Sequence, residues 1–298
     1  MADSARRPRL PAWLRRLLSS PTGLYGIAIV VILLAVGLLS LLWTPYDPAA
    51  ADPYHRFQPP SAEHWLGTDT SGRDILSRLI VGARTTVIVA FLSAVVAAVV
   101  GTLFAVLGSL THRLVREGIT VIIDVLIAFP TVLMAMMLAA VFGGSTAVVI
   151  AAVGITYGVI MGRVARSELR RVAGSDYILA ARASGVGPGR ILLRHLLPNV
   201  APIFIVQLSL AAGLATLAEA ALSYLGYGAP PGVPSWGRML SETQQYIAVQ
   251  PLSVLWPGLV ILFTVLGFNL LGDALRDATD PRLKGAARVR GTKRKVAA

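Results

Sequence analysis

The 298-residue sequence contains no cysteine, and only 14% of its residues are charged. The absence of cysteine excludes disulfides and thiolate metal sites. Soluble domains carry about 25% charged residues, whereas this chain is 55% apolar with a mean hydropathy of +0.69. Such a deficit of charge, together with long apolar runs, indicates a chain whose solvent is lipid.

Two sequence signatures of chemistry are also missing. The glycine-rich stretch Gly185–Arg190 lacks the Lys-Ser/Thr ending of a phosphate-binding loop. His55 and His64 lie nine residues apart near several aspartates, but a zinc site needs several convergent donors and this spacing specifies none. We therefore expect neither ATP hydrolysis by this chain alone nor a metal site.

The basic residues are placed as topology signals. The net charge of +12 could suggest a nucleic-acid partner, but the lysines and arginines sit between and beyond the apolar runs. For this reason we expect no nucleic acid. The C-terminal basic run Arg288–Lys295 is expected to be a solvated tail attracted to anionic membrane lipid.

Six apolar segments predict an all-α integral membrane protein with six transmembrane helices. The first is too long for a secretory signal, so we interpret it as a retained helix. Pro130, Pro202 and Pro257 lie within or near segments, which neighbouring helices in a membrane can accommodate. The segments are about Thr22–Trp43, Thr85–Leu110, Gly118–Phe142, Thr146–Gly162, Val200–Glu219 and Leu252–Gly272.

The distribution of lysine and arginine predicts the orientation. With the N-terminus in the cytoplasm, 22 of these residues fall on the cytoplasmic side and five on the other. This bias favours a multi-pass protein with both termini in the cytoplasm.

The predicted spans divide the chain into a six-helix core and its connections. Residues 1–21 form an N-terminal tail, 22–272 the six-helix domain and 273–298 a basic tail. Two long external loops cover about 44–84 and 220–251, and one cytoplasmic loop covers 163–198. Within the first external loop, the helical spacing of apolar residues over Asp74–Val81 predicts a short helix on the membrane surface or on a neighbouring element.

The cytoplasmic loop contains a predicted helix–turn–helix. Ser175 is a plausible N-cap, and Asp176 is favourable in the first turn. Glycines around Pro188 would end this helix, and Gly185 can adopt a positive φ. A second short helix, with Arg190 and Arg194 on one face, would then run to Pro198.

This segment resembles the cytoplasmic coupling loop of bacterial ABC-importer permeases, which docks into a groove on the ATPase subunit. Ala180-Ala181, Gly185 and Leu197-Pro198 carry the match. Leu179 and His195 depart from the general pattern, in which many members have Glu and Ile, but are similar to the peptide-permease branch. The resemblance implies that the ATPase-coupling residues are Asp176, Ala180, Ala181, Arg182, Gly185, Arg190, Leu197 and Pro198.

Further blocks resemble the C-type subunits of the dipeptide/oligopeptide and nickel transport family. They include His64–Asp69, Gly72–Asp74, Glu219–Gly226, Pro234–Gly237 and Phe268–Asp273, in that order. The resemblance implies a non-catalytic permease of the bacterial cytoplasmic membrane, without a cofactor of its own. It would form the path for di- or oligopeptides with a homologous permease, two ATPase subunits holding ATP and Mg, and an external substrate-binding protein. Nickel, glutathione and haem remain alternative substrates.

Two carboxylates within the spans are candidates for a pathway or gate. Asp124 either snorkels to water or faces a cavity or partner. Glu219 either caps an external gate, contacts the binding protein or joins a loop network. Four glycines have a structural role and are not expected to bind substrate, because they let helices pack closely: Gly101, Gly108, Gly158 and Gly162.

Two other classes of protein compete with a transporter. An intramembrane hydrolase using Ser223 is disfavoured because all four histidines fall outside the predicted spans. A receptor or scaffold without transport leaves the helix–turn–helix unexplained.

Overall fold

The computed structural model describes residues 12–110 and 112–279, and within them it contains helices and loops but no strand. One isolated bridge joins Thr68 to Asp74. The longer helices are α2 (Pro21–Leu39), α3 (Ile75–Leu110), α4 (Arg113–Ala128), α5 (Thr131–Phe142), α6 (Thr146–Ala173), α9 (Leu197–Tyr224) and α11 (Pro251–Thr279). Shorter ones are α1 (Ala12–Ser19), η1 (Pro53–His55), α7 (Asp176–Ala183), α8 (Pro188–Ile191), the π-helical turn η2 (Leu192–Leu196), α10 (Trp236–Thr243) and η3 (Gln244–Tyr246).

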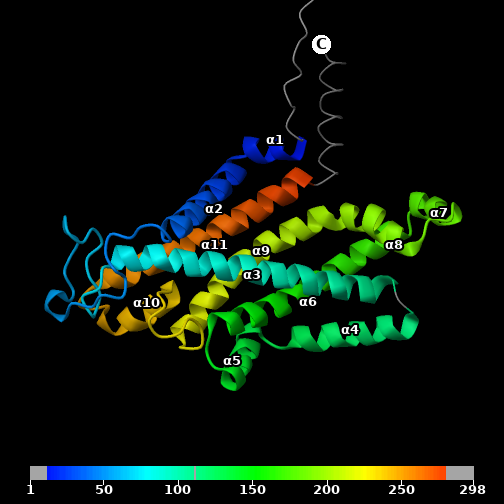
Figure 1. Cartoon of the computed structure of the whole chain (residues 1–298). Coiled ribbons are helices and arrows are strands. Elements are labelled where there is room, and N and C mark those ends of the chain that lie inside the picture. Colours follow the sequence, from blue (N-terminus) through cyan, green and yellow to red (C-terminus); the bar gives the residue numbers. More distant parts are fainter. Residues whose placement is uncertain (1–11, 111, 280–298) are drawn as a thin grey trace, which may run out of the picture.

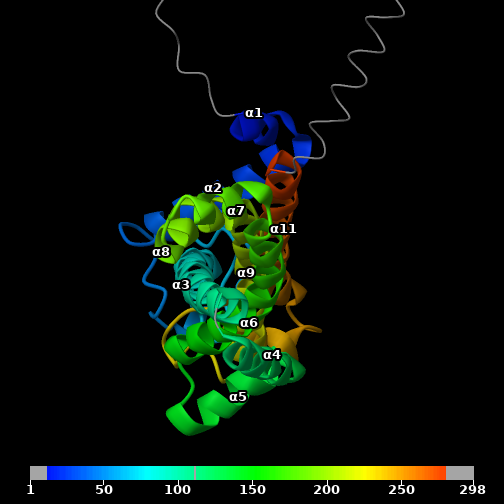
Figure 2. The same ribbon diagram turned by 90° about the vertical axis from the view of Figure 1, so that its right-hand side faces the viewer.

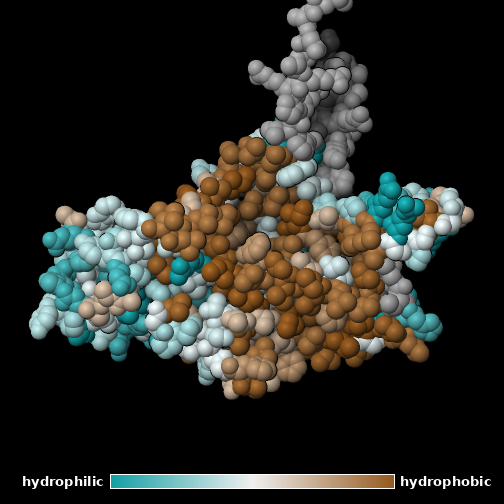
Figure 3. Space-filling view, viewed as in Figure 1, coloured by the Kyte–Doolittle hydropathy of each residue, from teal (hydrophilic) through white to brown (hydrophobic). Residues whose placement is uncertain are grey.

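The long helices form one elongated bundle with polar ends (Figure 1). The loop of residues 40–74 and α10 lie at one end, and α7 and α8 lie at the other. Apolar side chains cover the middle of the visible face, while hydrophilic ones gather at both ends (Figure 3). Five helices are long and apolar enough to cross a membrane. The predicted all-α membrane fold is therefore confirmed.

The third predicted span is broken rather than straight. Over 118–142 the structure has two helices, α4 and α5, which meet at 88°. Phe129 adopts an extended conformation, φ −82° and ψ 124°, as expected for a residue before proline. Counted as one span, the bent pair brings the number to six. It lies along the edge of the bundle opposite α1 (Figure 2).

Pro202 and Pro257, in contrast, stay inside continuous helices. Proline by itself therefore does not decide where a helix of this protein ends. Pro257 is buried among neighbouring helices, which is the setting in which an interior proline is tolerated.

The closest helix packing joins α3 to α6 through small residues. A Cβ on Gly158 would lie 2.6 Å from Cβ of Val100, and one on Gly162 would lie 2.8 Å from Cβ of Phe104. On the opposing helix, a Cβ on Gly101 would lie 3.0 Å from the carbonyl oxygen of Gly158. The predicted packing role of these glycines is confirmed, and Gly108 similarly lies against the side chain of Arg166.

Helices α3 and α6 extend furthest beyond the predicted spans. The expected short helix over 74–81 is the beginning of α3, which runs without a break for 36 residues. Ile75 and Leu79 are buried against Trp236 and Met239 of α10, so this segment lies on a neighbouring element and not on the lipid surface. At the other end of the bundle, α6 continues past Gly162 to Ala173.

Candidate functional site

The predicted helix–turn–helix is present at one end of the bundle (Figure 1). Helix α7 ends at Ala183, and Gly185 follows with φ +78°, the left-handed conformation that favours glycine. Pro188 then occupies the first turn of α8. We refer to residues 174–198 as the coupling hairpin. Ser175 stands at the N-cap position, but its hydroxyl donates to the carbonyl of Val172 at 2.6 Å and does not cap α7.

The second limb of the hairpin is longer than predicted. It does not end at Pro198, because α8, η2 and α9 follow one another without a break as far as Tyr224. The amide of Leu197 donates to the carbonyl of Leu192, a π-type bond, just before the proline that lacks an amide hydrogen. The wider π turn lets the helix continue past Pro198, and so the hairpin is joined directly to a membrane span.

Apolar side chains fix the hairpin to the bundle. Ile178 of α7 and Ile191 of α8 are buried in one cluster with Leu169, Val172 and Val200. At the base, the side-chain amide of Asn199 donates to the hydroxyl of Tyr177 at 3.2 Å. These contacts hold the two limbs as one unit against α6 and α9.

The opposite side of the hairpin is open to solvent. Of the predicted coupling residues, Asp176, Ala180, Arg182, Gly185, Arg190 and Pro198 are exposed, while Ala181 and Leu197 are partly buried. Three apolar side chains that sequence reasoning did not select, Tyr177, Leu179 and Leu193, are also exposed, at 47%, 51% and 69%. The signal that could have identified these three residues is their apolar character within a loop that is otherwise polar and basic. Together with the exposed Arg182 and Arg190 they give the hairpin a mixed apolar and basic exposed face.

The carboxylate of Asp124 has an ion-pair partner in addition to its contact with solvent. Its carboxylate pairs with Arg163 of α6, and both side chains are more than half exposed. One turn further along α6, Arg166 donates to the hydroxyl of Thr120 at 2.6 Å. Arg166 also carries its charge close to Asp124. The ion pair thus lies in a polar, basic part of the surface, which favours contact with water or a polar partner over contact with lipid.

Glu219 lies in the interior of the chain. It is 1% exposed, and the hydroxyl of Ser223 donates to its Oε1 at 2.7 Å. The same hydroxyl accepts the amide of Ala229 at 3.0 Å, which fixes the loop after α9. The structure thus places Glu219 in a loop network, and its burial leaves little surface for a binding protein to contact.

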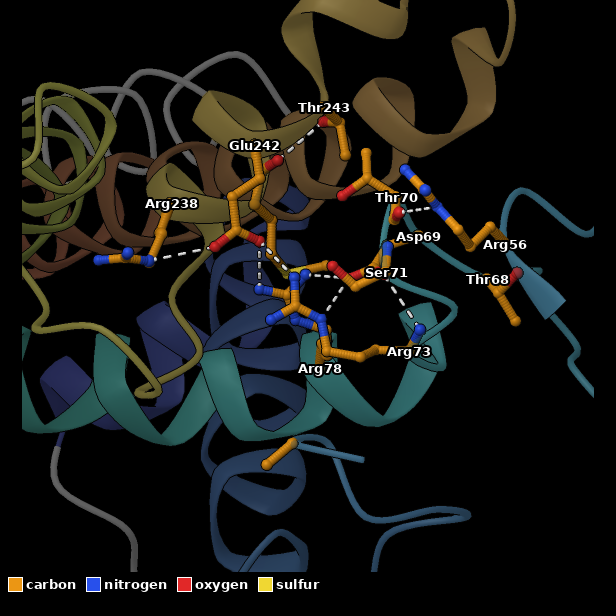
Figure 4. Close-up of polar contacts among 12 residues, drawn as sticks. Arg56, Thr68, Asp69, Thr70, Ser71, Arg73, Arg78, Arg238, Glu242 and Thr243 are labelled. Carbon is orange, nitrogen blue, oxygen red and sulfur yellow. Dashed lines mark hydrogen bonds and ion pairs between the residues drawn. The ribbon is translucent and has the colours of Figure 1, made fainter. Parts of the chain in front are cut away.

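At the other end of the bundle, an ion network joins the end of the loop of residues 40–74 and the start of α3 to α10 (Figure 4). Glu242 of α10 accepts from Arg73 and Arg78 at 2.8 Å each, and from Arg238 at 3.1 Å. Asp69 pairs with the same Arg73, at 2.8 Å, and with Arg78. Burial acts to raise the pKa of Glu242, but Arg78, Arg73 and Arg238 outweigh it and hold that pKa below its ordinary value of 4.5. We call these five residues the outer ion network.

Two of the four histidines, both in the loop of residues 40–74, have carboxylate partners. His55 pairs with Asp52 at 2.6 Å, and His64 pairs with Asp74 at 2.9 Å. Among the residues that the structure describes, no group of three or more histidine, aspartate or glutamate side chains could hold a metal ion.

The comparisons with known proteins agree on one class. The binding-protein-dependent transport system inner membrane component family matches residues 97–285, and the N-terminal TM domain of oligopeptide transport permease C matches residues 12–60. The first match covers more than half of the chain. The chain belongs to the ABC-importer permeases of the binding-protein-dependent type, in the group of oligopeptide, dipeptide, nickel and glutathione C-type subunits.

Individual relatives align over nearly the whole chain. The dipeptide transport system permease protein of Alkalihalophilus pseudofirmus is 38% identical, covering 91% of this chain and 89% of its own. The glutathione transport system permease protein of Pectobacterium atrosepticum is 36% identical, with coverages of 94% and 93%. The nickel transport system permease protein of Escherichia coli K12 is 35% identical, with coverages of 87% and 93%.

Among solved structures, a chain of the inward-facing MetNI methionine ABC transporter shares the fold. Its TM-score is 0.57 at 18% identity, with 69% of this chain and 98% of that chain covered. Family membership makes this protein a multi-pass, non-catalytic membrane component of an ABC transporter complex, without a cofactor of its own and with the ATPase on separate subunits.

Proposed function

We propose that this chain is one of two homologous permease subunits that together form the path of a peptide importer. The relatives carry dipeptide, glutathione and nickel in their names. A dipeptide permease stands highest among these in identity, which supports di- or oligopeptides as the substrate. Nickel, glutathione and haem are the competing substrates.

The coupling hairpin is the observation that carries the proposed mechanism. Ile178 and Ile191 anchor it in the bundle, while Leu179 and Ala180 face outward. A groove on an ATPase subunit would receive this outer face, and closure of two ATPases on ATP would draw the two permease hairpins together. That movement would switch the path from inward-facing to outward-facing.

Asp124 and Arg163 are proposed to line the path between the two permeases. Both side chains are open to the outside of this subunit, and each belongs to a different helix. The coupling hairpin would then lie in the cytoplasm with both termini. The loop of residues 40–74 and α10 would lie outside, where a substrate-binding protein delivers its cargo.

A transport-coupled ATPase assay tests the proposal. The complex is purified through a tag on this chain, placed in lipid nanodiscs and mixed with its external binding protein. Dipeptides, longer peptides, glutathione, chelated nickel and haem are then compared as substrates. Stimulation by dipeptides or longer peptides is the expected result.

Other outcomes separate the alternatives. Stimulation by glutathione, nickel or haem alone would replace the peptide assignment but keep the transport role. A complex that brings down no ATPase would contradict the coupling role and favour a receptor or scaffold.

A further inference from the structure

The outer ion network borders a small cavity at the end of the bundle that carries α10. The cavity has a volume of about 80 Å³. Its charged lining consists of Arg73, Arg78, Arg238 and Glu242, and short apolar loop segments at 48–49 and 232–234 close it. We call it the basic cavity.

The charges around the basic cavity do not balance. Three guanidinium groups face two carboxylates, those of Asp69 and Glu242. Asp74, the next acidic residue, is engaged by His64 and by the amide and hydroxyl of Ser77. Because a charge removed from water is costly unless it is paired, the extra guanidinium favours the arrival of one more anionic group.

Arg78 provides a second, independent indication. Its side chain is only 3% exposed, yet its Nε has no hydrogen-bond partner among the residues that the structure describes. Arg73 and Arg238, at 20% and 26% exposed, keep the network open to solvent. The cavity therefore combines buried and reachable arginine donors.

Size and donor type define the ligand. A cavity of about 80 Å³ holds a few water-sized groups, which suits the head of one side chain and is far too small for a peptide. Planar guanidinium groups favour carboxylates, which they bind through paired hydrogen bonds. The chemistry that fits is thus a single carboxylate.

We propose that the basic cavity accepts an acidic side chain of the external substrate-binding protein and thereby fixes how that protein docks. This inference rests on the proposed function, since it requires the binding protein to reach the outer end of the bundle. Glu219, the residue singled out in the sequence for such a contact, is buried; Arg73 and Arg238 are reachable instead.

Charge reversal tests the electrostatic part. Arg238→Glu is compared with Arg56→Glu. Arg56 is an exposed arginine in the loop of residues 40–74, at the same end of the bundle, and it does not line the cavity. The dissociation constant of the binding protein is measured on the complex in nanodiscs. Arg238→Glu should raise it about tenfold or more, whereas Arg56→Glu should change it less than about twofold. Arg238→Gln, which introduces no repulsion with Glu242, is the second variant, and co-purification of all subunits verifies assembly.

Cross-linking tests the location. Because the chain has no cysteine, Val233→Cys places one thiol at the cavity and Val249→Cys places one on the exposed turn after η3, as a matched control. Each is paired with single cysteines introduced beside the surface acidic residues of a cysteine-free binding protein. One acidic position should cross-link to residue 233 and not to residue 249, and replacing that acid by lysine should restore affinity to Arg238→Glu.

The results separate the possible carboxylates and the two proposals. The loss in Arg238→Glu should be equal for binding protein loaded with a free peptide and with a C-terminally amidated peptide. A loss seen only with the free peptide would overturn the inference in favour of the substrate carboxylate, and equal affinities for both charge reversals would overturn it outright. If instead no binding protein binds to the wild-type complex, the proposed function itself fails.

Discussion

The indole nitrogen of Trp236 donates to the carbonyl of Leu79 at 3.0 Å, and its ring fills the space that a side chain at Gly82 would need. A Cβ at that glycine would lie 2.5 Å from Cδ1 of the ring. Because Trp236 is only 3% exposed, it has little room to move aside. One glycine of α3 and one tryptophan of α10 thus join these two helices at one end of the bundle.

Gly82→Ala is expected to destabilise the protein by about 1–3 kcal/mol, the usual cost of extra volume in a packed interior. Thermal unfolding in nanodiscs measures the effect. Gly258→Ala is the control, since no atom lies within 4 Å of its added Cβ. Equal unfolding temperatures for the two variants would contradict the close contact with Trp236.

Packing between α3 and α6 can be tested in the same way. Gly158→Ala places a Cβ 2.6 Å from Cβ of Val100, and α3 must move away. Gly118→Ala, on α4, meets nothing within 4 Å and serves as the reference. We expect a lower unfolding temperature and a smaller yield of assembled complex only for Gly158→Ala, again by about 1–3 kcal/mol.

Within this chain, Gly185 should matter for its backbone conformation and not for the space that a side chain would need. Its φ is +78°, and a Cβ there would touch nothing within 4 Å of this chain. Left-handed backbone costs residues with a Cβ about 1–2 kcal/mol, and asparagine less. Transport-coupled ATPase activity should therefore fall in the order wild type, Gly185→Asn, Gly185→Val, with membrane insertion unchanged.

A bulky substitution at the same position tests the docked partner. Gly185→Trp should abolish uptake while insertion is kept, since the partner surface would meet the ring. Gly187→Ala, at a φ of −63° and with open space around it, is expected to behave as wild type. Normal transport by Gly185→Trp would contradict docking at the turn.

The pair formed by Asp124 and Arg163 predicts a charge-dependent path. Asp124→Asn and Arg163→Gln should each reduce transport, because each leaves one charge of the pair without its partner. The exchanged double variant, Asp124→Arg with Arg163→Asp, should recover part of the activity. Additive losses in the double variant would show that the pair itself is not what matters.

Stability should depend on pH through Glu242. Its pKa is lowered in the folded protein, so its ion pairs stabilise the fold above the ordinary glutamate pKa of 4.5, and this contribution is lost as the pH falls through the folded-state pKa. Glu242→Gln should therefore unfold at a lower temperature than wild type at pH 7, and the gap should close below about pH 4.5. A gap of constant size would rule out this ionisation as its cause.

The sequence predicted what local patterns determine and missed what distant contacts determine. Apolar runs located the spanning helices, and four glycines were predicted to let helices pack closely, although the sequence did not say which helices would meet. Three prolines near predicted spans looked alike, yet only Pro130 separates two helices, because neighbours decide whether an interrupted helix continues.

The polar sites show the same limit. The sequence singled out the segments Gly72–Asp74 and Asp74–Val81, which contain Arg73 and Arg78. Their partner Glu242, however, lies 169 and 164 residues further along the chain. No local sequence pattern predicts that Glu242 pairs with these two arginines. In the coupling hairpin the turn at Gly185 was predictable from glycine, whereas the outward direction of Leu179 follows from the burial of Ile178 beside it.

The helix that begins inside the coupling hairpin has a mechanical consequence. From Pro188 to Tyr224 it is a single rod of 37 residues, about 55 Å long at 1.5 Å per residue. A displacement of one end of such a helix would be transmitted to the other end, where Glu219 and Ser223 hold the loop after α9. The π turn at Leu192–Leu196 is the place where this helix departs from regular α-helical bonding. The stiffness of that turn would set how much of a displacement at the hairpin end reaches the loop after α9.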